Sequence, residues 1–115
     1  MKKITVTMIA LLFIVSLGAS PLLAQTFYED GGTWNIENTI IEENVFIRNN
    51  TKVNFNNGAI VTTIVRISDN GEANFFEGSD VNQISIQDST AVGNIHGGSI
   101  VSAGTRDRGT INIYG

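Results

Sequence analysis

The sequence predicts an all-β protein built as a parallel β-solenoid, on three observations. A short motif with a central asparagine recurs about every twenty residues, apolar side chains alternate between its copies, and β-branched and aromatic residues dominate the apolar positions. A unit of this size is too small to bury its own apolar face, whereas stacked units close a continuous core. We expect a right-handed β-helix of about four coils, with a two-sheet β-roll or a β-sandwich as the alternative.

The asparagine column sets the register of the repeat. Its members are separated by 19, 20, 20 and 18 residues: Asn35, Asn54, Asn74, Asn94 and Asn112. Their neighbours on both sides are mostly apolar, so strand alternation turns the asparagines outward. Stacked amides bond to their copies above and below, so we expect a structural ladder, with carbohydrate binding as the alternative role. Glycines four residues further on predict turns: Gly58, Gly78 and Gly98.

A second column marks another corner of the coil: Asn49, Asp69, Asp88 and Asp107. Asp and Asn favour turns because their side chains bond to nearby backbone. A small or turn residue follows two positions on: Thr51, Gly71, Thr90 and Gly109. Stacked carboxylates repel unless water or an ion intervenes, which makes calcium conceivable here. The calcium-binding Gly-Gly-x-Gly-x-Asp repeat is absent, however, because Ser99 and Ile100 follow Gly97-Gly98, and we expect no metal site.

The inward positions form further columns, and we expect three short strands in each coil. One strand contains Val53 and Phe55, a second starts near Ile60, and a third spans residues 65–67. The expected inward columns are Ile36, Phe55, Phe75, Ile95 and Ile113; Ile40, Ile60, Val81 and Ile100; Val45, Val65, Ile84 and Ala103; and Ile47, Ile67, Ile86 and Thr105.

The amino-terminal residues 1–24 are typical of a signal peptide. Lys2 and Lys3 precede an apolar run over residues 4–17, and a helix breaker and Ala24 follow. We expect cleavage after Ala24, a secreted or cell-surface location, and no membrane segment after cleavage. Residues 25–33 do not fit the repeat and are expected to form an amino-terminal cap.

Residues 34–115 hold the repeats, which run to the last residue. This predicts either a fragment of a longer repeat protein or an open carboxy-terminal coil that self-associates with another chain. A polysaccharide or a cell surface is the other expected partner.

Composition excludes several classes of function. The chain has no cysteine, which rules out disulfides and thiolate metal sites. Residues 25–115 hold all eleven acidic residues and five basic ones, a formal charge of −6, so nucleic acid is not an expected partner. His96 is the only histidine and has no obvious catalytic partner, so we expect an exposed turn residue. We recognise no catalytic constellation and expect neither enzymatic activity nor a cofactor.

The motifs Val53-Asn54-Phe55-x-x-Gly58 and Asn94-Ile95-His96-Gly97-Gly98-Ser99-Ile100 carry a family resemblance. Together with the Asp-containing turn, they resemble the Val-Asn-Ile-x-Gly-Gly repeats of bacterial secreted and surface β-helix proteins, including autotransporter-like passengers. The resemblance covers about residues 34–115 and implies a surface-located structural or adhesive role. The alternative is a carbohydrate-active β-helix domain, like a polysaccharide lyase or hydrolase, for which Asp88 and Asp107 are the candidate carboxylates.

Overall fold

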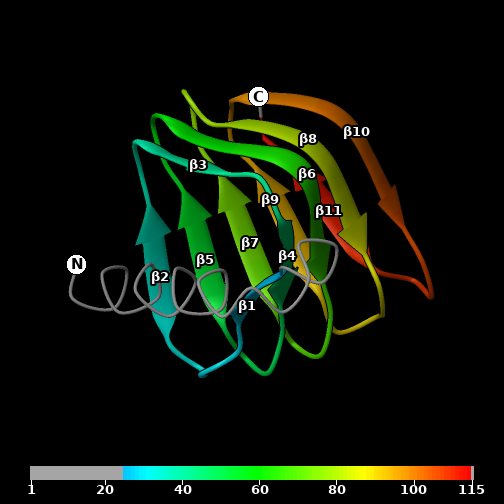
Figure 1. Ribbon diagram of the computed structural model, residues 1–115. Helices are drawn as coiled ribbons and strands as arrows, with labels where there is room; N and C mark the ends of the chain where they lie inside the picture. The colour runs from blue at the N-terminus through cyan, green and yellow to red at the C-terminus, as the bar shows by residue number, and fades with distance from the viewer. Residues whose placement is uncertain (1–24, 115) are drawn as a thin grey trace.

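The computed structural model describes residues 25–114, and the expected signal peptide at 1–24 lies outside the described residues. The described chain forms two parallel sheets (Figure 1). The first sheet contains β1 (Gln25–Tyr28), β3 (Thr39–Ile41), β4 (Asn44–Ile47), β6 (Ala59–Ile67), β8 (Asp80–Ile86) and β10 (Ser99–Thr105). The second contains β2 (Thr33–Ile36), β5 (Lys52–Phe55), β7 (Glu72–Phe75), β9 (Val92–Ile95) and β11 (Thr110–Ile113).

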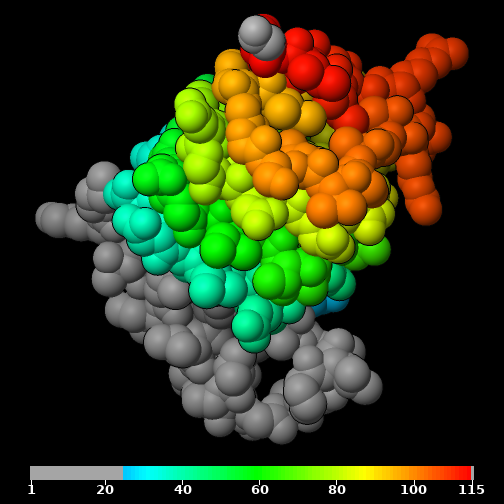
Figure 2. All heavy atoms as spheres, turned by 90° about the horizontal axis from the view of Figure 1, so that it is seen from above, coloured from blue at the N-terminus to red at the C-terminus, as the bar shows by residue number. Residues whose placement is uncertain are grey.

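The predicted parallel β-solenoid is confirmed, with about five turns. Every strand pair in the described chain is parallel and joins one turn to the next, which excludes a β-sandwich built from antiparallel hairpins. Figure 2 shows the turns stacked in sequence order, from cyan to red. Within residues 25–114, no helix is long and apolar enough to cross a membrane.

The expected cap at residues 25–33 is corrected, because this segment belongs to the first turn. Strand β1 pairs with β4 in register, placing Thr26 beside Val45 and Tyr28 beside Ile47. Thr26 and Tyr28 are 3 % exposed and occupy inward positions of the repeat. Their side chains are a threonine and a tyrosine where later turns have valine and isoleucine, which hid the match. Counting this turn raises the expected four coils to about five.

The three expected strands per coil are also corrected. The segments near Ile60 and at 65–67 form one continuous strand, β6, and β6, β8 and β10 arch over the second sheet (Figure 1). A register shift between Val61 and Ile64 puts one extra residue into β6 relative to β8. Val81 therefore pairs with Val61, and Ile60 lies beside Asp80. The inward column is Ile41, Val61, Val81 and Ile100, while Ile40 is 62 % exposed.

The other expected inward columns are confirmed by the register. Phe55 lies beside Phe75, and their rings stack with centroids 4.9 Å apart and planes 3° apart. The neighbouring inward side chains Val53, Val65 and Ile67 are fully buried. Each fully buried side chain of this size contributes about 1.5–3 kcal/mol, so stacked columns supply most of the stability. At the last turn the same column ends in Ile113, which is 76 % exposed because no described turn covers it.

Candidate functional surface

The asparagine column forms a continuous amide ladder on the outer face of the second sheet. Each Nδ2 donates to the Oδ1 of the asparagine one turn earlier, at 2.9 Å in all four steps from Asn54 to Asn112. The parallel register holds the amides beside one another. The expected outward ladder is therefore present, and Asn74 is its most enclosed member at 8 % exposed.

The ladder leaves hydrogen-bonding capacity at its carboxy-terminal end. An asparagine amide has two donor hydrogens and a carbonyl oxygen with two lone pairs. Asn74 also donates to Glu72 Oε2, at 3.1 Å. Asn94 uses one donor and one acceptor in the ladder, and Asn112 uses one donor. The amides of Asn94 and Asn112 are half-buried and keep groups for an outside partner.

An aromatic ladder, which the sequence analysis missed, runs beside these amides. It consists of Phe76, His96 and Tyr114, each two residues after an asparagine of the ladder. The Phe76 and His96 rings lie 4.9 Å apart and nearly parallel, and His96 and Tyr114 lie 4.6 Å apart. The ring faces cover one another, so the ring edges, and not the faces, line the side of the solenoid. His96 is exposed, as expected, but it is a member of this ladder and not an isolated turn residue.

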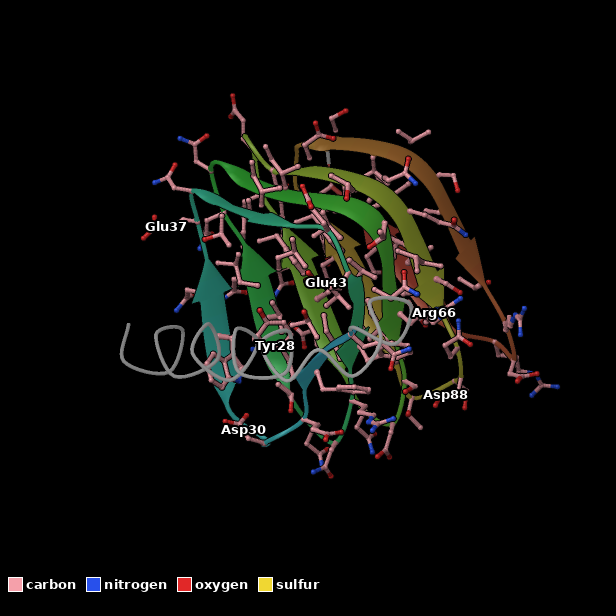
Figure 3. All side chains as sticks on the ribbon, in the orientation of Figure 1. Tyr28, Asp30, Glu37, Glu43, Arg66 and Asp88 are labelled. Carbon is pink, nitrogen blue, oxygen red and sulfur yellow. The ribbon has the colours of Figure 1, made fainter. Side chains whose placement is uncertain are left out.

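The turn column lies along the opposite corner of the coil and includes Asp30, which the sequence analysis also missed (Figure 3). Asp30 Oδ1 accepts from the Gly32 backbone N–H at 2.8 Å and from Trp34 Nε1 at 3.0 Å. The left-handed backbone expected of turn residues occurs at Asn49, Asp69 and Asp107. The signal for Asp30 was its spacing of 19 residues from Asn49.

Asp88 departs from the column because its turn is one residue longer than the others. Its backbone is not left-handed, and Ala91, not the expected Thr90, occupies the buried position of Thr51 and Gly71. The Asp88 carboxylate accepts from the Asp69 backbone N–H at 2.8 Å, and from the Thr90 hydroxyl and N–H. These bonds, the one from Asp69 first, lower the pKa of the Asp88 carboxyl below its ordinary value of 3.8.

The outer face of the first sheet carries an aromatic pair flanked by two arginines. Phe27 and Phe46 stack with centroids 5.0 Å apart. The Arg48 guanidinium lies 4.9 Å from the Phe27 centroid and also pairs with Glu29, at 2.6 Å. Arg66 lies 5.6 Å from the Phe46 centroid (Figure 3). On the inner side of this sheet, burial and then the charge of Glu43 raise the pKa of the Tyr28 phenol.

Among residues 25–114, no group of three or more His, Cys, Asp or Glu side chains is placed to hold a metal ion. The carboxylates of Asp88 and Asp107, the candidates for sugar chemistry, lie in successive turns of the column. The bonds of Asp88 go to turn backbone and Thr90, which is the structural role expected for this column. In the same part of the chain, every buried side-chain nitrogen or oxygen has a hydrogen-bond partner.

The side of the solenoid that carries the asparagine and aromatic ladders is therefore the best candidate for a binding surface.

The chain matches no known protein-family model, no curated protein and no solved structure.

Proposed function

We propose that this is an exported surface protein with a structural or adhesive role, and that it binds a neutral polysaccharide along the paired ladders. The binding surface consists of Asn94, His96, Asn112, Tyr114 and the adjoining Phe76. The resemblance of its repeats to bacterial surface β-helix proteins supports the location. The observation that carries the proposal is the alignment of a hydrogen-bonding amide ladder with an aromatic ladder in the same register.

The chemistry of this surface suits a chain of sugar hydroxyls. The amides of Asn94 and Asn112 offer donors and acceptors, and the imidazole and phenol edges of His96 and Tyr114 add more. Tyr114 is 52 % exposed, so its phenol is accessible. Successive strands repeat these groups about every 4.8 Å, which matches a polymer better than a single small ligand.

The net charge favours a neutral polymer over an acidic one. Residues 25–115 have a formal charge of −6, which repels polyanions at long range. The two arginines of the first sheet lie on another face, over Phe27 and Phe46. We therefore expect binding to uncharged glucans, mannans or chitin-like polymers before polyuronides.

The test is a pull-down of the exported protein with insoluble and immobilised polysaccharides, followed by titration of any that bind. His96→Ala and Tyr114→Ala should each weaken binding about tenfold, the loss expected for one or two hydrogen bonds. Phe27→Ala is the matched control, because Phe27 is a stacked, 38 % exposed aromatic residue on the other sheet.

Equal losses in all three variants, or no binding to any polysaccharide, would contradict the proposal. Release of reducing sugar during incubation would instead support the carbohydrate-active alternative. Circular dichroism on each variant separates lost binding from lost folding.

A further inference from the structure

We infer that exported chains stack head to tail, so that the edge formed by β10 and β11 of one copy pairs in parallel with the edge formed by β1 and β2 of the next copy. This inference concerns assembly and does not rest on the proposed polysaccharide binding. Within residues 25–114, β10 and β11 are end strands at one end of the stack, and β1 and β2 are end strands at the other (Figure 1). Cleavage after Ala24, the predicted site, makes Gln25 the first residue of the exported chain.

The backbone groups at the two ends are complementary. Thr110 and Tyr114 donate their N–H groups to Ala91 and Ile95 of the preceding turn. Successive residues of a strand point to opposite sides, so Ile111 and Ile113 direct their backbone groups away from β9. At the other end, Ile36 accepts from Asn56, which leaves Thr33 and Asn35 directed away from β5. A second copy placed one strand spacing away continues the same ladder.

The polarity of the asparagine ladder fits this direction of stacking. Every step runs from the Nδ2 of one asparagine to the Oδ1 of the asparagine one turn earlier. Among the described residues, Oδ1 of Asn112 accepts no bond, and Nδ2 of Asn35 donates none. In the stack, Asn35 of the next copy lies in register with Asn112 and adds another identical step.

Charge complementarity repeats across the junction. The residues after the strands of the first sheet stack in one column: Glu29, Arg48, Ser68, Gln87 and Arg106. Within the chain, Arg48 and Glu29 form an ion pair. At the junction, Arg106 lies next to Glu29 of the next copy, which places opposite charges in adjacent turns of this column, with the arginine now in the earlier turn. The segment between β10 and β11 projects from the end of the stack, where it can reach a neighbour (Figure 2).

The inward columns also match in size. On its inward side, the last strand of the first sheet is lined by the small side chains Ala103 and Thr105. The same columns begin at Thr26 and Tyr28, so small side chains meet larger ones. Ile113, 76 % exposed, comes to lie beside Ile36 of the next copy and is covered there.

Cysteine cross-linking tests the geometry directly, because the natural chain contains no cysteine. Thr33 and Thr110 lie in the same outward column, in the first and last turns, so within one chain they are too far apart for a disulfide. Across the junction they are neighbours on parallel strands, a separation that a disulfide spans. The exported Thr33→Cys/Thr110→Cys variant should give a ladder of dimers, trimers and longer species under mild oxidation. Each single variant should stay monomeric on a non-reducing gel, and a mixture of the two should stop at dimers.

Sedimentation of the exported, unmodified chain over a wide concentration range should show open-ended association. Ile113→Pro removes a backbone donor on the free edge and keeps the bonds to β9, so association should weaken at least tenfold. Arg106→Glu should weaken association, and adding Glu29→Lys should restore it. Val101→Ser is the control. Val101 is 74 % exposed on β10, so its replacement should reduce only nonspecific hydrophobic association. A chain that remains monomeric at all concentrations, or a Thr110→Cys variant that cross-links to itself, overturns the inference.

Discussion

The central turns around β5 and β7 and the last turn of β10 and β11 follow one register but differ sharply in burial. Phe55 and Phe75 are fully buried, whereas Ile113, in the same column, is 76 % exposed. Strand β10 is exposed along almost its whole length, although β8 beside it is buried at every inward position. The same side-chain pattern therefore has a different energetic value depending on whether another turn covers it, as expected for a quasi-one-dimensional stack.

The largest contrast should come from truncating the inward phenylalanine column at its centre and at its end. Phe55→Ala leaves a cavity between two turns and should lower the free energy of unfolding by about 3–5 kcal/mol. Ile113→Ala should lower it by less than about 1 kcal/mol, because Ile113 is already solvated. Urea denaturation followed by circular dichroism measures both, and the single tryptophan, Trp34, reports on the first turn. Similar losses in the two variants would contradict the contrast.

Two glycines offer a second contrast. Gly78 has φ +89°, and a Cβ there meets Asn57, so Gly78→Ala should lower stability by about 1–3 kcal/mol. Gly104 has no neighbour within 4 Å of a Cβ and no left-handed backbone. Gly104→Ala should therefore raise stability by about 0.4–1 kcal/mol through the unfolded chain. Thermal denaturation distinguishes them by the sign of the change, and two destabilised variants would disprove the account of β10.

Substitutions in the asparagine ladder should also lower stability more at its centre than at its end, but by smaller amounts. Asn74→Ala breaks bonds to Asn54, Asn94 and Glu72 in a nearly buried position and should lower stability by about 1–3 kcal/mol. Asn112→Ala removes one bond at the end of the ladder and should lower it by about 0.5–1 kcal/mol. The difference between their urea midpoints is the measurement. Equal effects would mean that the ladder does not act as a chain of coupled bonds.

The smallest effect should be the pH dependence at Asp88. Its folded pKa is lowered, so its contribution is fully present above its ordinary value of 3.8 and is lost as the pH falls through the lowered pKa. At pH 7, Asp88→Asn should be less stable than the natural chain. The difference should be small, because the Asp88 carboxylate is exposed and its interactions are screened by solvent. This difference should shrink below about pH 4 in parallel denaturation series. If the difference in stability between the two chains stays constant down to pH 2, the Asp88 carboxylate is not its source.

The sequence predicts the repeat well where each turn has the same length. The asparagine column and the glycines at positive φ, including Gly58 and Gly98, lie at the positions that the repeat spacing predicts. The prediction fails where one turn gains a residue, as at Val61–Ile64 and after Asp88, because a one-residue shift moves a side chain to the opposite face.

The sequence predicted the asparagine ladder of the candidate surface but not the aromatic ladder beside it. Residues 25–33 looked unlike a coil because Thr26 and Tyr28 replace the usual valine and isoleucine of their columns. The aromatic ladder has a fixed offset of two residues from the asparagines. Phe76, His96 and Tyr114 are three different residue types, however, and only the parallel register shows that their rings stack. The role of this ladder in binding stays a prediction.

Amide hydrogen exchange on residues 25–115, at a concentration where they are monomeric, tests most directly the claim that burial by the next turn decides stability. Peptides covering β5 and β7 should exchange slowly, through cooperative opening of the stack, and peptides covering β10 and β11 should exchange many times faster. Protection should rise in β11 as the concentration is raised and chains stack. Uniform protection from β5 to β11 at low concentration would contradict the account.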